Sequence, residues 1–280
     1  MIIERQKLNL TESQSKLIKS GWGKDAVEKV TTEKISYKSD GLKVNGYIAY
    51  PKASSKKYPC IIWCRGGFGN AGALDDFNAQ GILGQIASWG YVVLESQYRG
   101  NAGGEGTDEF GGADLNDVLN LIPLADEIEN ANTELWGIEG WSRGGMMTYL
   151  TLTKSAIFKA AIVTGGITNL NCNVDESTFI KRLFESSLGN SDSINFEEKC
   201  KTRSIINFAD RLSKNTPLLI LHGTADSRVP PHNSIDLSYR LLEYKLLFRL
   251  VMLENGDHFL KSHKKEVDVL RKFWFEKYLK

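Results

Sequence analysis

The chain has 280 residues, of which 41% are hydrophobic and 25% are charged. This length and composition suit one large soluble domain with a substantial core. Lys plus Arg number 35 and Asp plus Glu 34, so no net charge favours a nucleic acid or an anionic membrane as the partner. The first residues hold no apolar core of signal-peptide length and no apolar run reaches membrane-spanning length, so we expect a cytoplasmic protein.

The four cysteines indicate neither a disulfide framework nor a structural zinc site. Cys60 and Cys64 belong to one predicted strand, which would separate their Cα atoms by roughly 13 Å, too far for a disulfide. Cys172 and Cys200 fall in an irregular region. Because no Cys and His spacing is typical of zinc and no glycine run has dinucleotide spacing, we expect no metal and no cofactor.

The chain is predicted to divide into an extension and a main domain. Residues 1–32 are polar and are expected to form an N-terminal extension packed on the main domain. Thr11 and Gln14 have the spacing of a capping box, which predicts one short helix there. Residues 33–280 then form the main domain.

Apolar strands alternate with amphipathic helices through the main domain. Strands are expected at 33–37, 42–50, 58–64, 91–96, 133–141, 158–163, 217–222 and 247–253. Helices are expected at 79–89, 115–122, from 146, at 233–244 and from about 264. Asp40-Gly41 between the first two strands predicts an antiparallel hairpin. The alternation predicts an α/β fold, a mainly parallel sheet with helices on both faces, whose site lies at the carboxyl ends of the strands.

Two further features of this domain are predicted from the pattern. Residues 168–213 are polar, contain turn residues and have no clean period, so we expect an inserted lid that is part helical. The terminal helix is expected to turn one apolar stripe toward the sheet, formed by Val267, Leu270, Phe273, Trp274 and Tyr278.

The strand that ends at Trp141 leads into a Gly-x-Ser-x-Gly sequence, residues 140–144. An apolar, helix-compatible segment follows, and strand, sharp turn and helix together are typical of a nucleophile elbow. Ser142 would stand at the apex, with the backbone N–H of Arg143 directed at any oxyanion formed there. The motif by itself leaves open an ordinary glycine-rich turn with a solvated serine.

A serine hydroxyl needs a base to take its proton before it can attack a carbonyl at neutral pH. His258 follows the last predicted strand and precedes the last helix, so it lies in a strand-end loop and is the predicted base. His222 ends a strand and is interpreted as a packed histidine that fixes its loop. His232 and His263 lie in polar surroundings and are expected to be solvated.

The acid that orients the histidine is expected in another strand-end loop, and residues 223–230 supply Asp226. Asp257 is a poorer candidate because the side chains of neighbouring residues on an extended loop point apart. The chain order Ser142, Asp226, His258 is the order of α/β-hydrolases and differs from the orders in chymotrypsin and subtilisin. We therefore predict these three residues as the catalytic triad.

Residues 65–68, Arg-Gly-Gly-Phe, end an early strand, where such hydrolases take their second oxyanion N–H. Paired glycines let the backbone approach a substrate oxygen closely, although a plain turn is the alternative. We predict an oxyanion hole from Arg143, Gly67 and Phe68. Trp141 and Phe68 are the predicted substrate-binding side chains.

These motifs together resemble the catalytic domain of the prolyl oligopeptidase family of serine peptidases, particularly its acylaminoacyl- and dipeptidyl-peptidase-like branches. The resemblance spans residues 33 to 280 and implies the same triad and the same oxyanion hole. The matching segments are residues 40–47, 98–101, 111–118, 140–145 and the loops around Asp226 and His258.

Two departures from the family pattern limit what the resemblance implies. Members of this branch usually carry His-Gly-Gly-Pro where this chain has Arg65 to Phe68, so the geometry of the oxyanion donors can differ. Family peptidases generally place a β-propeller before the catalytic domain, whereas here only residues 1–32 precede the hairpin. No N-terminal Glu pair of the kind that binds a free peptide amine is found, so peptidase specificity does not carry over.

We therefore expect a cofactor-free serine hydrolase that cleaves short peptide amides or small esters through an acyl-enzyme. His258 would act as general base and then general acid, and Asp226 would hold its tautomer. Two alternatives stay open: a carboxylesterase with little peptidase activity, and a non-catalytic binding protein that keeps the fold. No nucleic-acid or membrane partner is expected, and the sequence leaves a homo-oligomer open.

Overall fold

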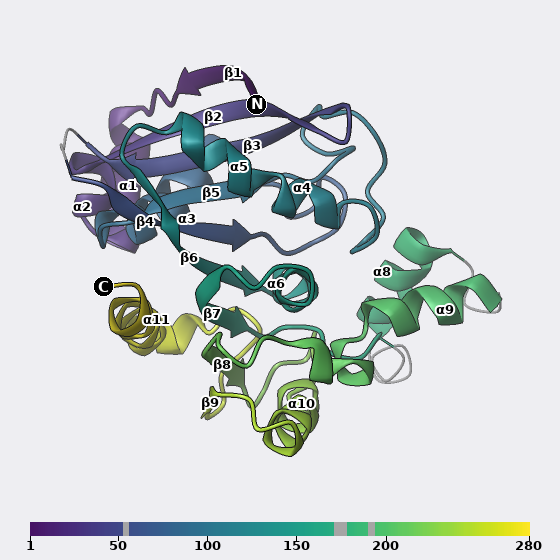
Figure 1. The fold of residues 1–280 in the computed structure, drawn as a ribbon. Helices are drawn as coiled ribbons and strands as arrows, with labels where there is room; N and C mark the ends of the chain where they lie inside the picture. Colours follow the sequence, from purple (N-terminus) through teal and green to yellow (C-terminus); the bar gives the residue numbers. More distant parts are fainter. Residues whose placement is uncertain (53–55, 171–177, 190–193) are drawn as a thin grey trace.

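The structure, a computed structural model, describes residues 1–52, 56–170, 178–189 and 194–280 (Figure 1). Its strands are β1 (Ile2–Lys7), β2 (Val30–Ser39), β3 (Leu42–Pro51), β4 (Tyr58–Cys64), β5 (Val92–Ser96), β6 (Ala131–Trp141), β7 (Phe158–Thr164), β8 (Leu218–Gly223) and β9 (Phe248–Leu253). Its α-helices are α1 (Glu12–Trp22), α2 (Asp25–Glu28), α3 (Asp76–Ser88), α4 (Leu115–Leu119), α5 (Leu121–Leu124), α6 (Arg143–Leu152), α8 (Thr178–Leu188), α9 (Ile194–Arg203), α10 (His232–Glu243) and α11 (Lys264–Leu279).

The strands form one twisted sheet in the order β1-β2-β3-β5-β4-β6-β7-β8-β9. The pairs from β5 through β9 along this order are parallel, whereas β1, β2 and β3 join by antiparallel pairing. β2 and β3 form the hairpin predicted from the Asp40-Gly41 turn. The predicted α/β architecture with a mainly parallel sheet is thus confirmed, and its strand ends gather at one edge.

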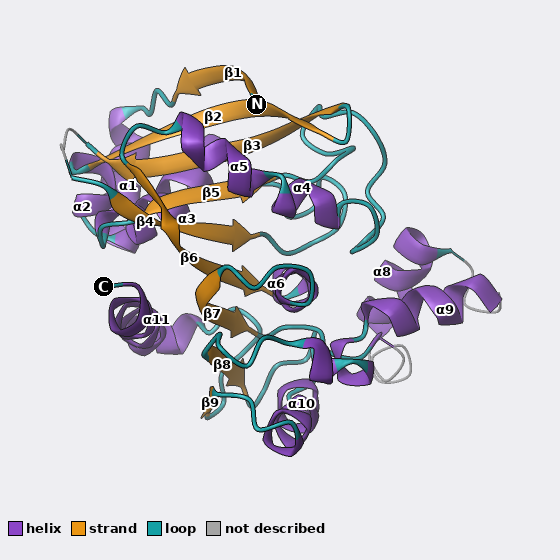
Figure 2. Cartoon of the chain, in the orientation of Figure 1, coloured by secondary structure: helices purple, strands orange, loops and turns teal. Residues whose placement is uncertain are grey.

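Helices cover both faces of the sheet (Figure 2). The larger core lies on the face covered by α4, α5, α6 and α10, and the smaller core lies on the face covered by α3 and α11. Buried strands of this kind are apolar on both sides, which explains why β4, β5 and β7 read as nearly continuous apolar runs. Within the residues described, no helix combines the length and the apolar character needed to cross a membrane.

The first 32 residues contribute an edge strand as well as helices. β1 pairs antiparallel with β2, a strand that the sequence pattern did not indicate. α1 begins at the predicted capping box, in which Gln14 N donates to Thr11 Oγ1 at 3.2 Å and Thr11 N donates to Gln14 Oε1 at 2.9 Å. α1 and α2 pack against α3, and the Trp22 ring meets the Phe77 ring edge-on at 5.6 Å.

Two helix predictions need correction. The helix expected over 115–122 is split into α4 and α5 at Asn120. In α11 the side chain of Phe273 is 48% exposed, so it does not face the sheet. Arg271 lies inside instead, where its Nη2 donates to Glu139 Oε2 at 3.1 Å across the core. A buried ion pair on the sheet-facing side of a helix is invisible to a count of apolar residues.

Candidate active site

Ser142 sits between the end of β6 and the start of α6, in the strand–turn–helix context predicted for it. Its backbone has φ 58° and ψ −122°, a strained combination for a residue with a side chain. The surrounding backbone holds it there, since Ser142 N donates to Thr164 O at 2.9 Å and Gly145 N donates to Ser142 O at 2.9 Å. The fold thus keeps the serine hydroxyl at the tip of a sharp turn.

The two glycines of the motif permit this turn because there is no room for a side chain at either position. A Cβ at Gly144 would collide with the backbone oxygen of Cys64 on the neighbouring strand. A Cβ at Gly140 would collide with the carbonyl of Gly144 itself. The turn therefore packs backbone against backbone, which brings Ser142 close to the loop that follows β4.

His258 and Asp226 come from the loops after β9 and β8 and meet at the same edge of the sheet. His258 Nδ1 lies 2.7 Å from Asp226 Oδ2, and both side chains are buried. The other carboxylate oxygen of Asp226 accepts from the backbone N–H groups of Arg228 and Val229, both at 2.9 Å. Burial acts to raise the pKa of the Asp226 carboxyl, but the hydrogen bonds from His222 and His258 and the charge of His258 outweigh it, and the pKa lies far below its usual range.

His222 supports the acid loop, as the interpretation of a packed histidine predicts. It is fully buried, its Nδ1 lies 2.6 Å from Ser234 Oγ, and its Nε2 lies 2.9 Å from Val229 O. Asp257 is exposed and accepts from the backbone N–H of Lys261 at 3.3 Å. His263 is not solvated as expected, because its side chain is only 14% exposed and its Nε2 contacts Glu254 O at 2.9 Å.

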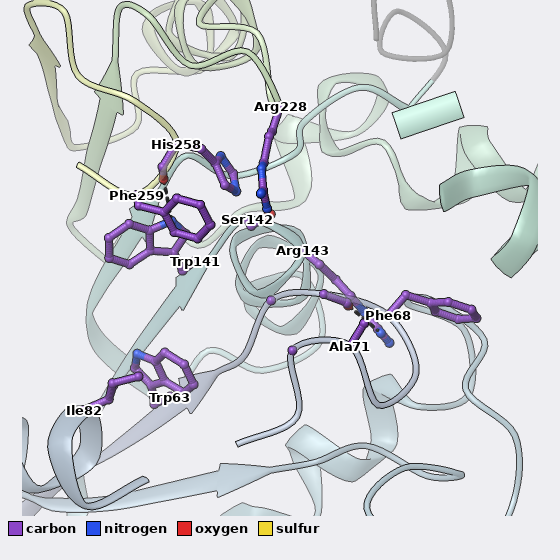
Figure 3. Close-up of a pocket in the computed structure, with 13 residues that line it drawn as sticks. Trp63, Phe68, Ala71, Ile82, Trp141, Ser142, Arg143, Arg228, His258 and Phe259 are labelled. Carbon is purple, nitrogen blue, oxygen red and sulfur yellow. Dashed lines mark hydrogen bonds between the residues drawn. The ribbon is translucent and has the colours of Figure 1, made fainter. Parts of the chain in front are cut away.

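Ser142 and His258 line one cavity of about 630 Å³ (Figure 3). The other residues that line it are Trp63, Gly66, Gly67, Phe68, Ala71, Gly72, Ile82, Trp141, Arg143, Arg228 and Phe259. Both predicted substrate-binding residues, Trp141 and Phe68, therefore face it. Trp141 also donates from Nε1 to the backbone oxygen of His258 at 3.0 Å. No hydrogen bond joins the Ser142 and His258 side chains in the described chain, and such contacts often tighten only when substrate binds.

The loop of residues 65–69 runs beside Ser142, and the side chain of Arg65 fixes its path. A Cβ at Gly66 would lie 3.3 Å from Ser142 Cβ, so the loop backbone and the serine are in contact. Arg65 is fully buried and donates to Gly66 O at 3.0 Å, to Gly69 O at 3.1 Å and to Gln97 O at 2.7 Å. Burial lowers the pKa of its guanidinium. The arginine that replaces the usual histidine thus ties this loop to the end of β5.

Arg143 has two separate contacts with the site. Arg143 lines the cavity, and because it is the first residue of α6 its backbone N–H has no acceptor within the helix. Its side chain turns inward, where Nη1 donates to Gly67 O at 3.0 Å and to Asp108 Oδ2 at 2.8 Å, and Nη2 donates to Asp114 Oδ2 at 2.6 Å. Although burial opposes the charge, the two carboxylates raise the pKa of the Arg143 guanidinium. Arg143 therefore carries one predicted oxyanion donor in its backbone N–H, and its side chain holds the Gly67 backbone that carries the other.

Tyr98 lies between the two arginines. Its ring centroid is 4.8 Å from the Arg65 guanidinium carbon and 4.6 Å from that of Arg143, and its hydroxyl donates to Arg65 O at 3.0 Å. The sequence did not assign roles to Arg65, Asp108 or Asp114. The segment 98–101, expected to organise the floor of the site, and the segment 111–118, which contains Asp114, are the signals that the sequence offers; Asp108 lies in neither.

Of the predicted lid region, residues 168–213, the described helix α8 approaches Phe68 only through Phe110. Phe184 of α8 meets Phe110 with ring centroids 5.5 Å apart, and Phe110 meets Phe68 at 6.0 Å. Among the described residues, none from α8 or α9 lines the cavity at Ser142. Residues 171–177, which include Cys172, and 190–193 of this region lie outside the described residues. In the described chain, no group of three or more His, Cys, Asp or Glu side chains is arranged to hold a metal ion.

Two curated proteins are similar to this chain in sequence. The uncharacterized peptidase YtmA of Bacillus subtilis (strain 168) is 32% identical over 213 residues, which is 76% of this chain and 78% of that protein. The uncharacterized peptidase YuxL of the same organism is 28% identical over 236 residues, and the match covers 81% of this chain but 35% of YuxL.

Solved structures agree in fold. An acylaminoacyl peptidase in complex with Z-Gly-Gly-Phe-chloromethyl ketone is 25% identical and superposes with a TM-score of 0.77. The uncomplexed acylaminoacyl peptidase of Pyrococcus horikoshii is 25% identical with a TM-score of 0.75. Each match covers 90% of this chain and 42% of the solved chain, so this chain spans less than half of those proteins. A model of the prolyl oligopeptidase family matches residues 79–280. The chain therefore has the α/β-hydrolase fold and belongs to the prolyl oligopeptidase family of serine hydrolases.

Proposed function

We propose that this chain cleaves short peptide amides and small esters through an acyl-enzyme on Ser142, with His258 and Asp226 completing a catalytic triad. The observation that carries the proposal is the 2.7 Å contact between His258 Nδ1 and Asp226 Oδ2 at the edge of the cavity that also holds the strained Ser142. The pKa of Asp226 lies far below its usual range, so it is ionised at neutral pH and holds a proton on Nδ1. Nε2 is then left as the acceptor.

The reaction would follow in two halves. Ser142 Oγ attacks the substrate carbonyl while His258 Nε2 takes its proton, and the negative charge moves onto the carbonyl oxygen. That oxygen would receive hydrogen bonds from the N–H of Arg143 and from the Gly67–Phe68 backbone. His258 then returns the proton to the leaving nitrogen or oxygen, and the bond to the carbonyl carbon breaks. A water molecule, activated by the same histidine, releases the acid and restores Ser142.

The substrates are proposed to be small. The cavity has a volume typical of sites for small molecules. We propose that the region 168–213 acts as a lid beside Phe68, since α8 reaches Phe110 next to it. A lid of that size can shape an acyl pocket but cannot filter long peptides. Three further features stay predictions. They are the role of residues 1–32 as an N-terminal extension of the main domain, the cytoplasmic location and the formation of a homo-oligomer.

A carboxylesterase with little peptidase activity is the second candidate, and the mostly apolar lining of the cavity favours it. An ester's alkoxide leaves with less help than an amine, so imperfect alignment costs an ester less. We therefore expect small esters to react fastest, aminoacyl or dipeptidyl amides more slowly, and longer peptides poorly.

The test begins with a fluorophosphonate probe, which labels an activated serine. The wild-type chain should be labelled and Ser142→Ala should lose both labelling and turnover, by about 10⁶-fold in kcat. The wild type is then assayed on p-nitrophenyl esters, aminoacyl anilides and peptides of rising length. Labelling that survives in Ser142→Ala contradicts the nucleophile, and no labelling of the wild type supports a binding protein. Preference for long peptides over esters by more than about tenfold contradicts the proposed substrate size.

A further inference from the structure

A second cavity adjoins the one at Ser142. It has a volume of about 230 Å³ and lies toward α1 and α11. Four side chains, Trp63, Ile82, Trp141 and Phe259, line both cavities. Because these side chains line both, the two cavities adjoin, and we call the two together the groove, which extends from Ser142 toward α1 and α11. We name these four residues the shared wall.

The groove lies on the side of the serine from which a leaving group departs. Phe259 follows His258 directly, and Trp141 holds the His258 carbonyl by the hydrogen bond from its indole. In Figure 3, Trp141 and Phe259 lie by His258, with Trp63 and Ile82 beyond them, whereas Phe68 lies on the opposite side of Ser142. The atom that leaves must come within hydrogen-bond reach of His258, since that residue protonates it. The group attached to that atom therefore enters the groove.

The chemistry of the groove favours an uncharged aromatic group. The shared wall is formed by two indoles, a phenyl ring and an aliphatic side chain, and flat rings pack best against such faces. Three of the four charged side chains at the far end are paired among themselves, and the fourth, Lys261, lies over the Phe259 ring with its Nζ 5.3 Å from the ring centroid. Lys264 Nζ lies 3.0 Å from Asp268 Oδ2, and Arg271 Nη1 lies 2.9 Å from Asp268 Oδ1. A charged leaving group would find no unpaired acidic or basic partner there among these three residues.

The far end of the groove is lined by Trp22 of α1. Trp22 lines the second cavity, and its ring is close enough to α3 that a Cβ at Gly81 would lie 2.7 Å from it. The edge-on contact with Phe77 holds the same ring. The segment of the chain that carries Trp22 precedes the residues matched by the family model. The N-terminal segment thus supplies a wall of the groove.

We propose that this groove is a leaving-group subsite for uncharged arylalkyl groups, with the shared wall holding the ring and Trp22 limiting its length. This inference rests on the proposed hydrolase function. The same subsite would hold the aromatic side chain of a residue that follows the scissile amide bond. Trp22, Ile82 and Phe259 are then specificity-determining residues.

The experiment compares three acetate esters, ethyl, 2-phenylethyl and 4-phenylbutyl, which share one acyl group and differ in the leaving alcohol. Because deacylation is common to all three, kcat/KM reports how the leaving group is bound during acylation. In the wild type both aryl esters should exceed the ethyl ester by about tenfold or more. Ile82→Trp, which fills the shared wall, should reduce that ratio to within about threefold of one, whereas Ile235→Trp, on an exposed position of α10, should leave it unchanged.

Because Trp22 is proposed to limit the length of the bound group, Trp22→Ala should raise the ratio of kcat/KM for the 4-phenylbutyl ester to kcat/KM for the 2-phenylethyl ester. Leu17→Ala, at an exposed position of the same helix, should leave that ratio unchanged. Independently of turnover, 4-phenylbutanol should quench tryptophan fluorescence of Ser142→Ala with a lower Kd than 1-butanol. If Ser142 is labelled and the ethyl ester is cleaved, but the aryl esters show no preference and the alcohols bind alike, the subsite is refuted while the function stands. If the wild type neither labels nor cleaves any ester, the proposed function fails, and the subsite with it.

Discussion

Two buried carboxyl groups in this molecule have pKa values shifted in opposite directions. Asp226, in the loop after β8, is 5% exposed, and both of its oxygens accept hydrogen bonds. Glu95, in the middle of the sheet on β5, is fully buried, and neither of its oxygens accepts a well-formed hydrogen bond from the described residues. The pKa of Asp226 lies far below its usual range. Burial raises the pKa of Glu95 to about 8, and the charge of Arg65 offsets this only in part.

The difference shows that a buried carboxyl in a loop after a strand meets other donors than one on a strand that is paired on both sides. At a strand end, loop N–H groups and side chains from other strands converge, so a carboxylate can be ionised and oriented at little cost. Within a sheet the backbone N–H groups are already used by neighbouring strands, so a carboxyl group there is left without donors. Asp226 can therefore orient a base. Glu95, by contrast, is predicted to lower the free energy of unfolding at neutral pH. The predictions below test this contrast.

The largest effect is expected at the strand end. Asp226→Asn should keep the fold but lower kcat by roughly 10³–10⁴-fold, since the amide favours the wrong tautomer of His258. Asp257→Asn makes the same change one residue before His258, at an exposed position, and should leave kcat nearly unchanged. The measurement is steady-state ester hydrolysis with circular dichroism as the check on folding. A large loss in Asp257→Asn without one in Asp226→Asn would show that the acid is wrongly assigned.

A smaller effect is expected at Arg65, which holds the loop of the predicted oxyanion donors. Arg65→Lys keeps the charge but cannot reach Gly66 O, Gly69 O and Gln97 O together, since a lysine lacks the planar fork. Loss of one oxyanion donor costs about 10²–10³-fold, so displacement of the loop should cost about 10- to 10²-fold in kcat/KM. Arg240→Lys, in an exposed ion pair with Glu243, is the matched control. Equal activity of both variants would mean that Arg65 does not position the donors.

The sequence was sufficient to predict the strand–turn–helix context of Ser142 and every strand of the sheet except β1. Apolar runs and helical spacing are local, and the Gly-x-Ser-x-Gly turn carries its own steric reason for Gly140 and Gly144. The order of Asp226 and His258 along the chain then placed them at neighbouring strand ends, because parallel strands end at one edge. The contact between their side chains followed from topology rather than from any local pattern.

Ion pairs between residues far apart in the chain could not be predicted from the sequence. The sequence motif assigns a role only to the backbone N–H of Arg143, yet the side chain of Arg143 donates to Asp108 and Asp114, which lie 35 and 29 residues away. Arg271 and Glu139 are 132 residues apart in the sequence. Charged residues are normally expected at the surface, so a buried pair of this kind cannot be recognised without the fold. β1 was missed for a related reason, because an exposed edge strand need not be apolar.

The smallest effect on activity, and a measurable one on stability, is expected at Glu95. Below about pH 4.5, the ordinary pKa of a glutamate, the folded and unfolded states both keep the proton, so the side chain adds no pH dependence. Between about pH 4.5 and pH 8 the unfolded chain releases the proton and the folded chain holds it, so the free energy of unfolding falls as pH rises.

Glu95→Gln should remove this fall in the free energy of unfolding, because the amide has no proton to release. Relative to the wild type, its free energy of unfolding should rise with pH and be larger by on the order of 4 kcal/mol near pH 7.5. Urea unfolding at pH 5 and pH 8 measures the change, with Glu134→Gln, an exposed glutamate, as the control. The value of kcat/KM should stay within about threefold, since Glu95 does not line the cavity at Ser142. If the stability gain is the same at both pH values, Glu95 is already ionised in the folded chain, and the contrast with Asp226 fails.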